Sequence, residues 1–335
     1  KVYARLGISF DVVHGESFYR DELAPLVQEL EEHEVSSLSN GAKVIHFGEN
    51  QRPKMLSDTV LIVQKADGAF LYGTTDLATL DFREREYKPD RVIYVTDLRQ
   101  QLHFQQVFSG WRALQEKRGV DLNTLGQLVH VWFGMLRLEE GAMSSRKGNV
   151  IRLVDLIDEG VRRAKEVTDE KSGSLSEEER ISIAEAVGLS AIRYADLSQN
   201  PQTDVQFSWD KLLSFEGNTA PFLMYSYARA RGIQRKARKE SPDVAALSSS
   251  SIYERALVLY LLRFPNAVEH ALESCKPNVV CDYLFELSSV FNRFYVESPV
   301  LSAETDALRE SRLALVEASL RVFQKCFSLL GIQAL

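Results

Sequence analysis

The fold is decided by residues 91–136, RVIYVTDLRQQLHFQQVFSGWRALQEKRGVDLNTLGQLVHVWFGML. Residues 91–97 are rich in β-branched and aromatic side chains, which is typical of a buried strand, and residues 130–136 repeat that composition. Residues 100–118, between them, are expected to form a long helix. A strand, a helix and a second strand make a βαβ unit, so this stretch predicts a parallel sheet.

The rest of the first half continues the alternation. Further strands are expected at 8–13, 42–47 and 59–64, and further helices at 19–33 and 74–86. We therefore expect a mainly parallel sheet. Ligands bind at the carboxyl ends of the strands of such sheets, so candidate functional residues are expected just after Phe70, Val95 and Leu136.

The second half changes character after Val150. Almost all of it is expected to be helical, over 153–170, 176–199, 219–238, 252–272, 279–296 and 303–330. We expect an α/β domain at 1–209 and an all-helical domain at 210–335.

Composition limits the class of protein. The 335 residues suit two domains, and 45% hydrophobic with 26% charged residues excludes collagen, low-complexity disorder and disulfide scaffolds. No run of about 18 apolar residues is present, so no membrane association is expected. Cys275, Cys281 and Cys326 form no zinc-type pair and fit a reducing compartment, so we expect a cytoplasmic protein without a tightly bound metal. The chain begins at Lys1 and its first methionine is Met55, so we expect a fragment lacking an N-terminal part.

The net charge of −7 hides an asymmetry, because the acidic excess lies in the first 209 residues. Residues 229–239 hold six cations and no acid. A charge run is usually a solvated helix face, and on charge alone we favour that reading. A strip that contacts phosphates is the alternative.

Residues 142–150, AMSSRKGNV, are the nearest candidate for a phosphate-binding loop, since neither a Gly-x-Gly-x-x-Gly nor a P-loop motif is present. The loop offers two hydroxyls and the cations Arg146 and Lys147, which can stabilise charge on a polyphosphate. An ordinary basic turn explains the composition equally well. In residues 70–76, FLYGTTD, Tyr72 and Asp76 share a helix face and suit a cationic substrate, although an aspartate there is more often a cap or dipole partner.

Six ordered segments resemble those of the arginyl-tRNA synthetases, a class I aminoacyl-tRNA synthetase family. They are FDVVHGESFY at 10–19, DGAFLYGTTDLATL at 67–80, RVIYVTDLRQQLHF at 91–104, HVWFGMLRLEEGAMSSRKGNVIRLVDLIDE at 130–159, FEGNTAPFLMYSYARAR at 215–231 and FNRFYVESPVL at 291–301. The resemblance implies that residues 1–209 are the later part of a Rossmann-like catalytic domain with the signature loop and connecting helices. Residues 210–335 would be the anticodon-binding bundle.

The family's Lys-Met-Ser-Lys-Ser loop falls on residues 142–146, where Ala142 and Ser145 replace both lysines. The resemblance implies catalytic roles for Ser144, Arg146 and Lys147. The family's His-Ile-Gly-His segment would belong to the missing N-terminal part.

The resemblance also implies binding residues. Arginine would be bound by Glu16, Tyr72, Asp76 and Gln100, because a carboxylate accepts two guanidinium donors in parallel. ATP would be bound by His130, Phe133, Met135 and Met143, although His130 is equally well explained as a satisfied strand histidine. Phe222, Tyr225 and Arg229 would contact tRNA, which favours an RNA-facing strip at 229–239, whereas Phe291, Phe294 and Tyr295 are expected in the core.

The implied activity is arginine–tRNA ligation. Arginine would attack ATP, which enters with Mg²⁺, and the arginyl group would pass to the 2′-hydroxyl of the terminal adenosine of tRNA(Arg). We expect a monomer, and we expect the fragment alone to be inactive. Two alternatives stay open: the cysteinyl enzyme, disfavoured by the absence of a zinc set, and a non-catalytic tRNA-binding fragment or paralogue.

Overall fold

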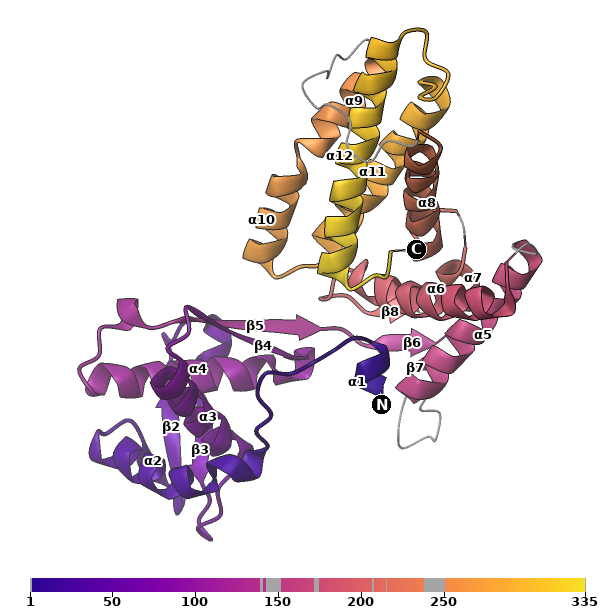
Figure 1. Cartoon of the computed structure of the whole chain (residues 1–335). Helices are drawn as coiled ribbons and strands as arrows, with labels where there is room; N and C mark the ends of the chain where they lie inside the picture. Colours follow the sequence, from indigo (N-terminus) through magenta and orange to yellow (C-terminus); the bar gives the residue numbers. More distant parts are fainter. Residues whose placement is uncertain are drawn as a thin grey trace. The chain divides into compact units, whose positions relative to one another are not determined.

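A computed structural model describes residues 2–138, 141–142, 152–171, 175–206, 208–214, 216–237 and 251–334. The chain divides into two compact units (Figure 1). The first, residues 10–134, is called the α/β unit. The second combines residues 1–9 with residues 135–335 and is called the helical unit.

The predicted βαβ element lies in the α/β unit. Strands β4 (Arg91–Asp97) and β5 (Gln127–Phe133) pair in parallel, from Arg91 opposite Gln127 to Asp97 opposite Phe133. They are joined by η3 (Leu98–Gln100), α4 (Gln101–Lys117) and η4 (Leu122–Thr124). The predicted second strand was placed about three residues late, but the expected partial parallel sheet is confirmed.

A separate antiparallel sheet contains β1 (Ser37–Ser39), β2 (Ala42–Phe47) and β3 (Thr59–Gln64). The strands at 42–47 and 59–64 are confirmed, but the expectation that they run parallel is wrong. Their linker holds only η2 (Lys54–Leu56), whereas a parallel pair needs a crossover of roughly a dozen residues or more. The strand expected at 8–13 is also wrong: no described strand pairs with this segment, and Val12 and Val13 are exposed.

Helices α2 (Arg20–Glu32) and α3 (Tyr72–Tyr87) cover this unit's core together with α4. Asp81 on α3 accepts hydrogen bonds from Trp111, Gln115 and Arg118 of α4 and its C-cap. Arg118 also pairs with Glu29 on α2, at 2.6 and 2.7 Å. The three helices are thus fixed to one another by a half-buried polar cluster.

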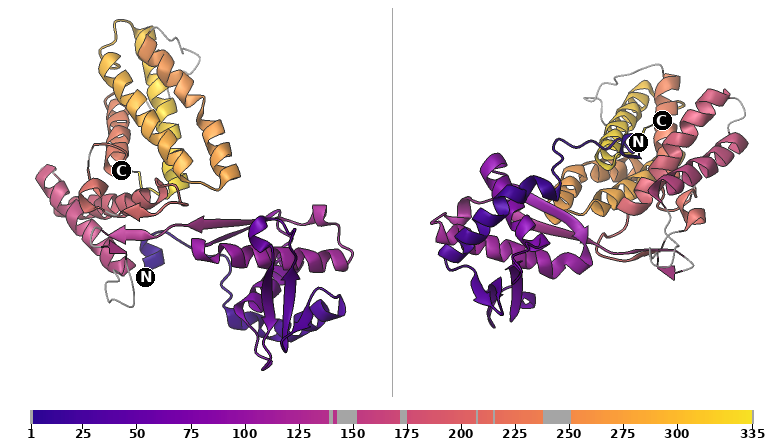
Figure 2. Two further views of the ribbon diagram at one scale, coloured as in Figure 1. Left: turned by 180° about the vertical axis from the view of Figure 1, so that it is seen from behind. Right: turned by 90° about the horizontal axis from the view of Figure 1, so that it is seen from below.

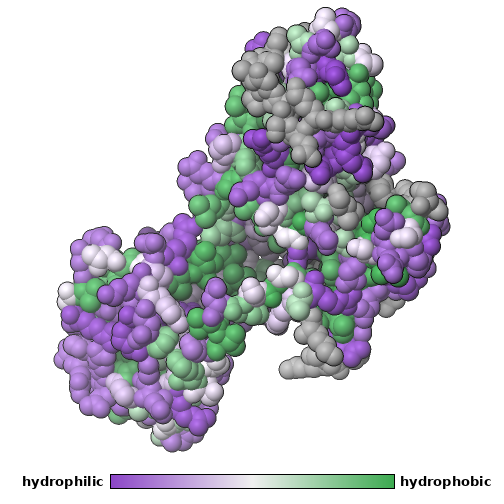
Figure 3. Space-filling view, in the orientation of Figure 1, coloured by the Kyte–Doolittle hydropathy of each residue, from purple (hydrophilic) through white to green (hydrophobic). Residues whose placement is uncertain are grey.

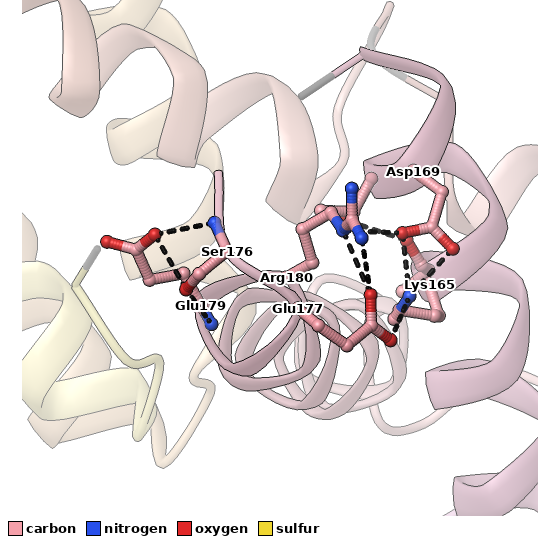
Figure 4. A network of polar contacts seen from close by, with 8 residues as sticks. Lys165, Asp169, Ser176, Glu177, Glu179 and Arg180 are labelled. Atoms are coloured by element: carbon pink, nitrogen blue, oxygen red, sulfur yellow. Dashed lines mark hydrogen bonds and ion pairs between the residues drawn. The ribbon is translucent and has the colours of Figure 1, made fainter. Parts of the chain in front are cut away.

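In the helical unit, α5 (Leu153–Lys171) and α6 (Glu177–Leu197) lie side by side. Gly188 permits this approach, because a Cβ there would lie 2.7 Å from the backbone of Val161. Figure 4 shows the polar network at their linked ends: Lys165 and Arg180 each contact both Asp169 and Glu177.

The first residues of the chain belong to the helical unit. Arg5, at the end of α1 (Val2–Arg5), pairs with Asp158 on α5 and Glu185 on α6. Arg193 of α6 donates to the carbonyl oxygens of Leu6 and Gly331. The unit also holds a small sheet of β7 (Gly141–Ala142), β6 (Leu136–Leu138) and β8 (Val205–Gln206).

Short helix α7 (Trp209–Leu212) packs with α5 and α6, where Leu212 joins Ile157 and Ile192 in a small core. The helices that follow form a bundle (Figure 2). They are α8 (Ala220–Ala237), α9 (Ile252–Leu261), α10 (Phe264–Ser274), α11 (Asn278–Glu297) and α12 (Asp306–Leu330). The single helix expected at 252–272 is divided in two, because Pro265 is tolerated in the first turn of a helix but not in its interior. Burial raises the pKa of the core thiol of Cys326 to about 12 and also raises that of Cys281.

Hydrophilic residues dominate the surface that Figure 3 shows for both units. Within the described ranges, no helix combines the length and apolar character needed to cross a bilayer.

Candidate functional site

The first turn of α3 places Tyr72 and Asp76 at the end of β3. Thr74, which is fully buried, donates its hydroxyl hydrogen to the carbonyl oxygen of Val63 and accepts a hydrogen bond from the N–H of Leu71 at 3.4 Å. This anchor fixes the helix start against the antiparallel sheet. The side chains four residues apart therefore project from a rigid turn.

Asp76 has a partner, His103, that is not among the residues predicted from the sequence. Asp76 Oδ2 lies 2.5 Å from Nε2 of His103, which stands in the first turn of α4. The ring of Tyr72 lies edge-on to that of His103, with 4.7 Å between centroids. The structure thus brings Tyr72 and Asp76 together and adds His103 to them. The sequence feature that could have indicated His103 is its position three residues after Gln100, a predicted arginine ligand.

The other two predicted arginine ligands lie on neighbouring elements. Gln100 ends η3, one residue before α4 begins, and its side chain is exposed. Glu16 begins η1 (Glu16–Tyr19) and is also exposed. The rings of Phe18 and Tyr19 contact Phe82 of α3, which lies six residues, or about 9 Å of helix, beyond Asp76.

His130 is 8% exposed and is held by β4, since its Nε2 lies 2.7 Å from Oγ1 of Thr96. Its Nδ1 is buried with no hydrogen-bond partner among the described residues. Burial lowers the pKa of this imidazole, and the neighbouring His103 lowers it further. Phe133, at the end of the same strand, is 44% exposed.

Met135 belongs to the helical unit, where its backbone N–H donates to Asp204 Oδ1 at 2.9 Å. That N–H is therefore engaged within its own unit, and the expected contact of Met135 with ATP stays a prediction. Met143, Ser144, Ser145, Arg146 and Lys147 lie outside the described residues. The described chain places the loop between β7, which ends at Ala142, and α5, which begins at Leu153.

A second group of polar and aromatic residues lies between α8 and α11. The guanidinium of Arg229 lies 4.8 Å from the ring centroid of Tyr225 and 4.6 Å from that of Tyr295. Arg229 donates to Asn292 Oδ1 at 2.7 Å, and Asn292 donates to Ser226 Oγ at 2.9 Å. Tyr225 is 53% and Tyr295 39% exposed, so the expectation that Tyr295 is a core residue is wrong.

The neighbouring residues divide between core and surface. Phe291 and Phe294 are fully buried, as expected, and Phe222 is half-buried, with its ring 5.6 Å from that of Phe285. Of the predicted basic strip, Arg235 and Lys236 are exposed. Arg238 and Lys239 lie outside the described residues.

In the part of the chain that the structure describes, no three His, Cys, Asp or Glu side chains are placed to hold a metal ion.

Two family models match the chain, one in its first part and one in its last part. The model described as "tRNA synthetases class I (R), catalytic domain" matches residues 1–209. The "DALR anticodon binding domain" model matches residues 223–335.

Individual proteins agree with these models. An arginine–tRNA ligase of Fusobacterium nucleatum is 44% identical over 345 aligned residues, covering 100% of this chain and 57% of the relative. The arginyl-tRNA synthetases of Plasmodium falciparum and Thermus thermophilus superpose on the whole chain with TM-scores of 0.84, at 30% and 26% identity. The chain covers 55% and 61% of those two structures.

The chain thus spans about 57% of the length of the curated relatives that it matches, and the sequence comparison extends over all of it. The expected fold class, a class I synthetase sheet followed by a helical anticodon-binding domain, is confirmed by the two family models. With the catalytic-domain model matching most of its residues, the chain belongs to the class I arginyl-tRNA synthetase family.

Proposed function

We propose that this chain is part of an arginine–tRNA ligase, which activates L-arginine with ATP and transfers it to the 2′-hydroxyl of the terminal adenosine of tRNA(Arg). The observation that carries the proposal is the half-buried carboxylate of Asp76, fixed beside Tyr72 at the start of α3. It supplies negative charge where a cationic side chain is to be recognised. Magnesium enters with ATP as part of the substrate.

Asp76 suits a guanidinium better than an ammonium. One of its oxygens, Oδ2, lies 2.5 Å from Nε2 of His103 on the neighbouring helix. A guanidinium is planar and presents its donors in a fixed fork, whereas an ammonium is a compact point charge. Glu16 and Gln100 complete this proposed pocket as exposed polar groups on neighbouring elements.

For ATP, the structure favours Phe133 over His130 as the side chain that contacts adenine. Phe133 is exposed at the carboxyl end of a parallel strand, where ligands of such sheets bind. His130 is buried and directed at Thr96. Met135 and Met143 stay candidates by motif alone. Ser144, Arg146 and Lys147 would shape the loop and neutralise the leaving pyrophosphate.

For tRNA, the support comes from the group of Tyr225, Arg229 and Tyr295. Aromatic rings stack on unpaired bases, and a guanidinium contacts phosphate or a base edge. Both tyrosines are partly exposed, and Arg229 is held between them. We assign tRNA binding to residues 210–335 and amino-acid activation to 1–209. The ligase would act as a monomer in the cytoplasm. Its three free thiols are consistent with a reducing compartment.

The test is ATP–pyrophosphate exchange in the full-length protein that carries this chain. We expect exchange that depends on L-arginine in the presence of tRNA(Arg), and none with L-cysteine or L-methionine. The fragment alone is expected to be inactive. Binding of tRNA without any amino-acid-dependent exchange would instead support the non-catalytic alternative.

A further inference from the structure

His103 contacts Asp76 of the proposed arginine pocket and has no role in the function described so far. Its Nε2 lies 2.5 Å from Asp76 Oδ2, and the two side chains are 12% and 28% exposed. Because the partners stand on α4 and α3, the hydrogen bond joins two helices that Asp81 and Arg118 already fix. The pair is therefore part of a rigid frame.

We infer that His103 is a positioning residue for arginine recognition, an inference that rests on the proposed function. In this role it donates from Nε2 to Oδ2 of Asp76 and leaves Oδ1 for the guanidinium. The terminal torsion of an aspartate is broad, so an unrestrained carboxylate samples many planes. A hydrogen bond on one oxygen selects one plane and lowers the entropic cost of binding a planar cation.

The surroundings of the imidazole support this role. Tyr72 packs edge-on at 4.7 Å, and the buried ring of Phe104 packs edge-on at 5.1 Å. These contacts restrict rotation of the imidazole, so the direction of Nε2 is set by packing. They also give Tyr72 a second function: besides lining the proposed pocket, its ring holds His103 against Asp76.

The chemistry requires a particular tautomer. An ionised carboxylate only accepts hydrogen bonds, so in this role Nε2 must carry a proton. The hydrogen bond then occupies Oδ2 and directs the carboxylate plane, with Oδ1 left for the substrate.

Three substitutions separate the donor from the volume of the ring. His103→Gln places an amide N–H near the position of Nε2, His103→Asn is polar but too short to reach, and His103→Leu fills the space without a donor. KM values for L-arginine and for ATP are measured by exchange in the full-length protein. We expect His103→Gln to stay close to the parent, and the other two to raise the KM for arginine about tenfold, the equivalent of one lost hydrogen bond of about 1.4 kcal/mol. The KM for ATP should not change.

Asp76→Asn is the reference variant. If it leaves the KM for arginine unchanged, the arginine site itself is misassigned and the role of His103 is overturned with it. If Asp76→Asn has a strong effect but all three His103 variants behave like the parent, positioning alone is overturned. Equal defects in His103→Gln, His103→Asn and His103→Leu would also overturn it, because the donor would then not matter.

A measurement on the unaltered protein avoids any folding defect of the variants. Long-range ¹H–¹⁵N spectra of the histidine rings report which nitrogen carries the proton. We expect His103 to be protonated at Nε2 and its signals to shift on addition of L-arginine, with no such shift in Asp76→Asn. A ring protonated only at Nδ1 cannot donate to Asp76 and would overturn the inference.

Discussion

The charged groups at the centres of the two candidate sites are held in different ways. In the α/β unit, Asp76 Oδ2 lies 2.5 Å from Nε2 of His103, and the ring of Tyr72 packs on that histidine. In the helical unit, Arg229 lies directly between the rings of Tyr225 and Tyr295. Under the proposed function, the first arrangement would direct a carboxylate towards a small planar cation. The second places a cation beside two partly exposed aromatic rings, which suits unpaired bases.

The largest expected effect breaks the first arrangement. Asp76→Ala removes the carboxylate, and charged hydrogen bonds contribute about 1.5–3 kcal/mol, so we expect the KM for arginine to rise roughly 10- to 100-fold. Kinetics of arginine-dependent exchange in the full-length protein test this, with the KM for ATP as the internal control. Unchanged arginine kinetics would remove Asp76 from the pocket.

The second arrangement is broken by Tyr225→Ala. Stacking of a base on an aromatic ring contributes about 1–3 kcal/mol, so we expect tRNA(Arg) to bind about tenfold more weakly. Arginine and ATP kinetics should be normal. Because Tyr225 is largely exposed, thermal stability should hardly change.

Phe222→Ala is the matched control on the same helix. Its ring packs against the core, so this variant should lose stability. A Tyr225→Ala variant that only lowered thermal stability would place Tyr225 with Phe222, as a packing residue.

Arg229→Lys sharpens the comparison by keeping the charge and removing the planar group. A lysine cannot stack between two rings in the way a guanidinium does, so we expect tRNA binding to weaken about two- to fivefold, in line with a cation–π contribution of ~0.5–1 kcal/mol. Filter binding at two salt concentrations tests this. A slope of affinity against salt equal to the parent's is expected, since the number of cations is unchanged.

The stability of the α/β unit should fall at acidic pH because of His130. Its pKa is lowered in the folded state by burial and by His103, so below the ordinary histidine value of about 6.5 the unfolded chain takes up the proton first. The stability contribution is therefore present above that pH and is lost as the pH falls through the folded pKa. Urea unfolding at pH 7.5 and 5.5, followed by hydrogen exchange in residues 91–133, should show the loss. His130→Gln should flatten it, and an unchanged slope in that variant would assign the effect elsewhere.

The smallest effect is expected in the network of Figure 4. Arg180→Ala removes contacts to Glu177 and Asp169, which are exposed carboxylates. Exposed ion pairs contribute about 0.2–1 kcal/mol, so the free energy of unfolding of the helical unit should fall by no more than that. Denaturant unfolding measures it, and 1 M salt should reduce the difference between variant and parent. A loss of several kcal/mol would mean that the network does more than join two surface helices.

The sequence predicts most helices because their apolar spacing is strong. In α2, the spacing of Leu23, Leu26, Val27 and Leu30 puts them on one face of the helix, and all four are buried. The strands at 42–47 and 59–64 were also located correctly, but their direction was not, because strand composition does not encode the partner. The segment at 8–13 shows the same limit: apolar alternation without a neighbouring strand produced no ladder.

In the candidate site too, local contacts could be predicted from the sequence and contacts between elements could not. Tyr72 and Asp76 could be paired from the sequence, because their four-residue spacing on a helix fixes their neighbourhood. His103 could not be added, since its contact with Asp76 depends on how α3 packs against α4. Tyr295 was assigned to the core because aromatic residues on a bundle helix usually lie there, and only the packing of α8 on α11 shows its exposed face.

The path of the chain through its two units has a consequence for the order in which they can be completed during translation. The chain starts in the helical unit, passes through the whole α/β unit, and returns at Met135. A ribosome therefore delivers the α/β unit in full while Arg5 still lacks Asp158 and Glu185, and while the carbonyl oxygen of Leu6 still lacks Arg193. Helix α1 therefore gains these partners only from residues more than a hundred positions later in the chain. A chain truncated near residue 140 should thus contain a protected α/β unit and a protease-sensitive segment at residues 1–9.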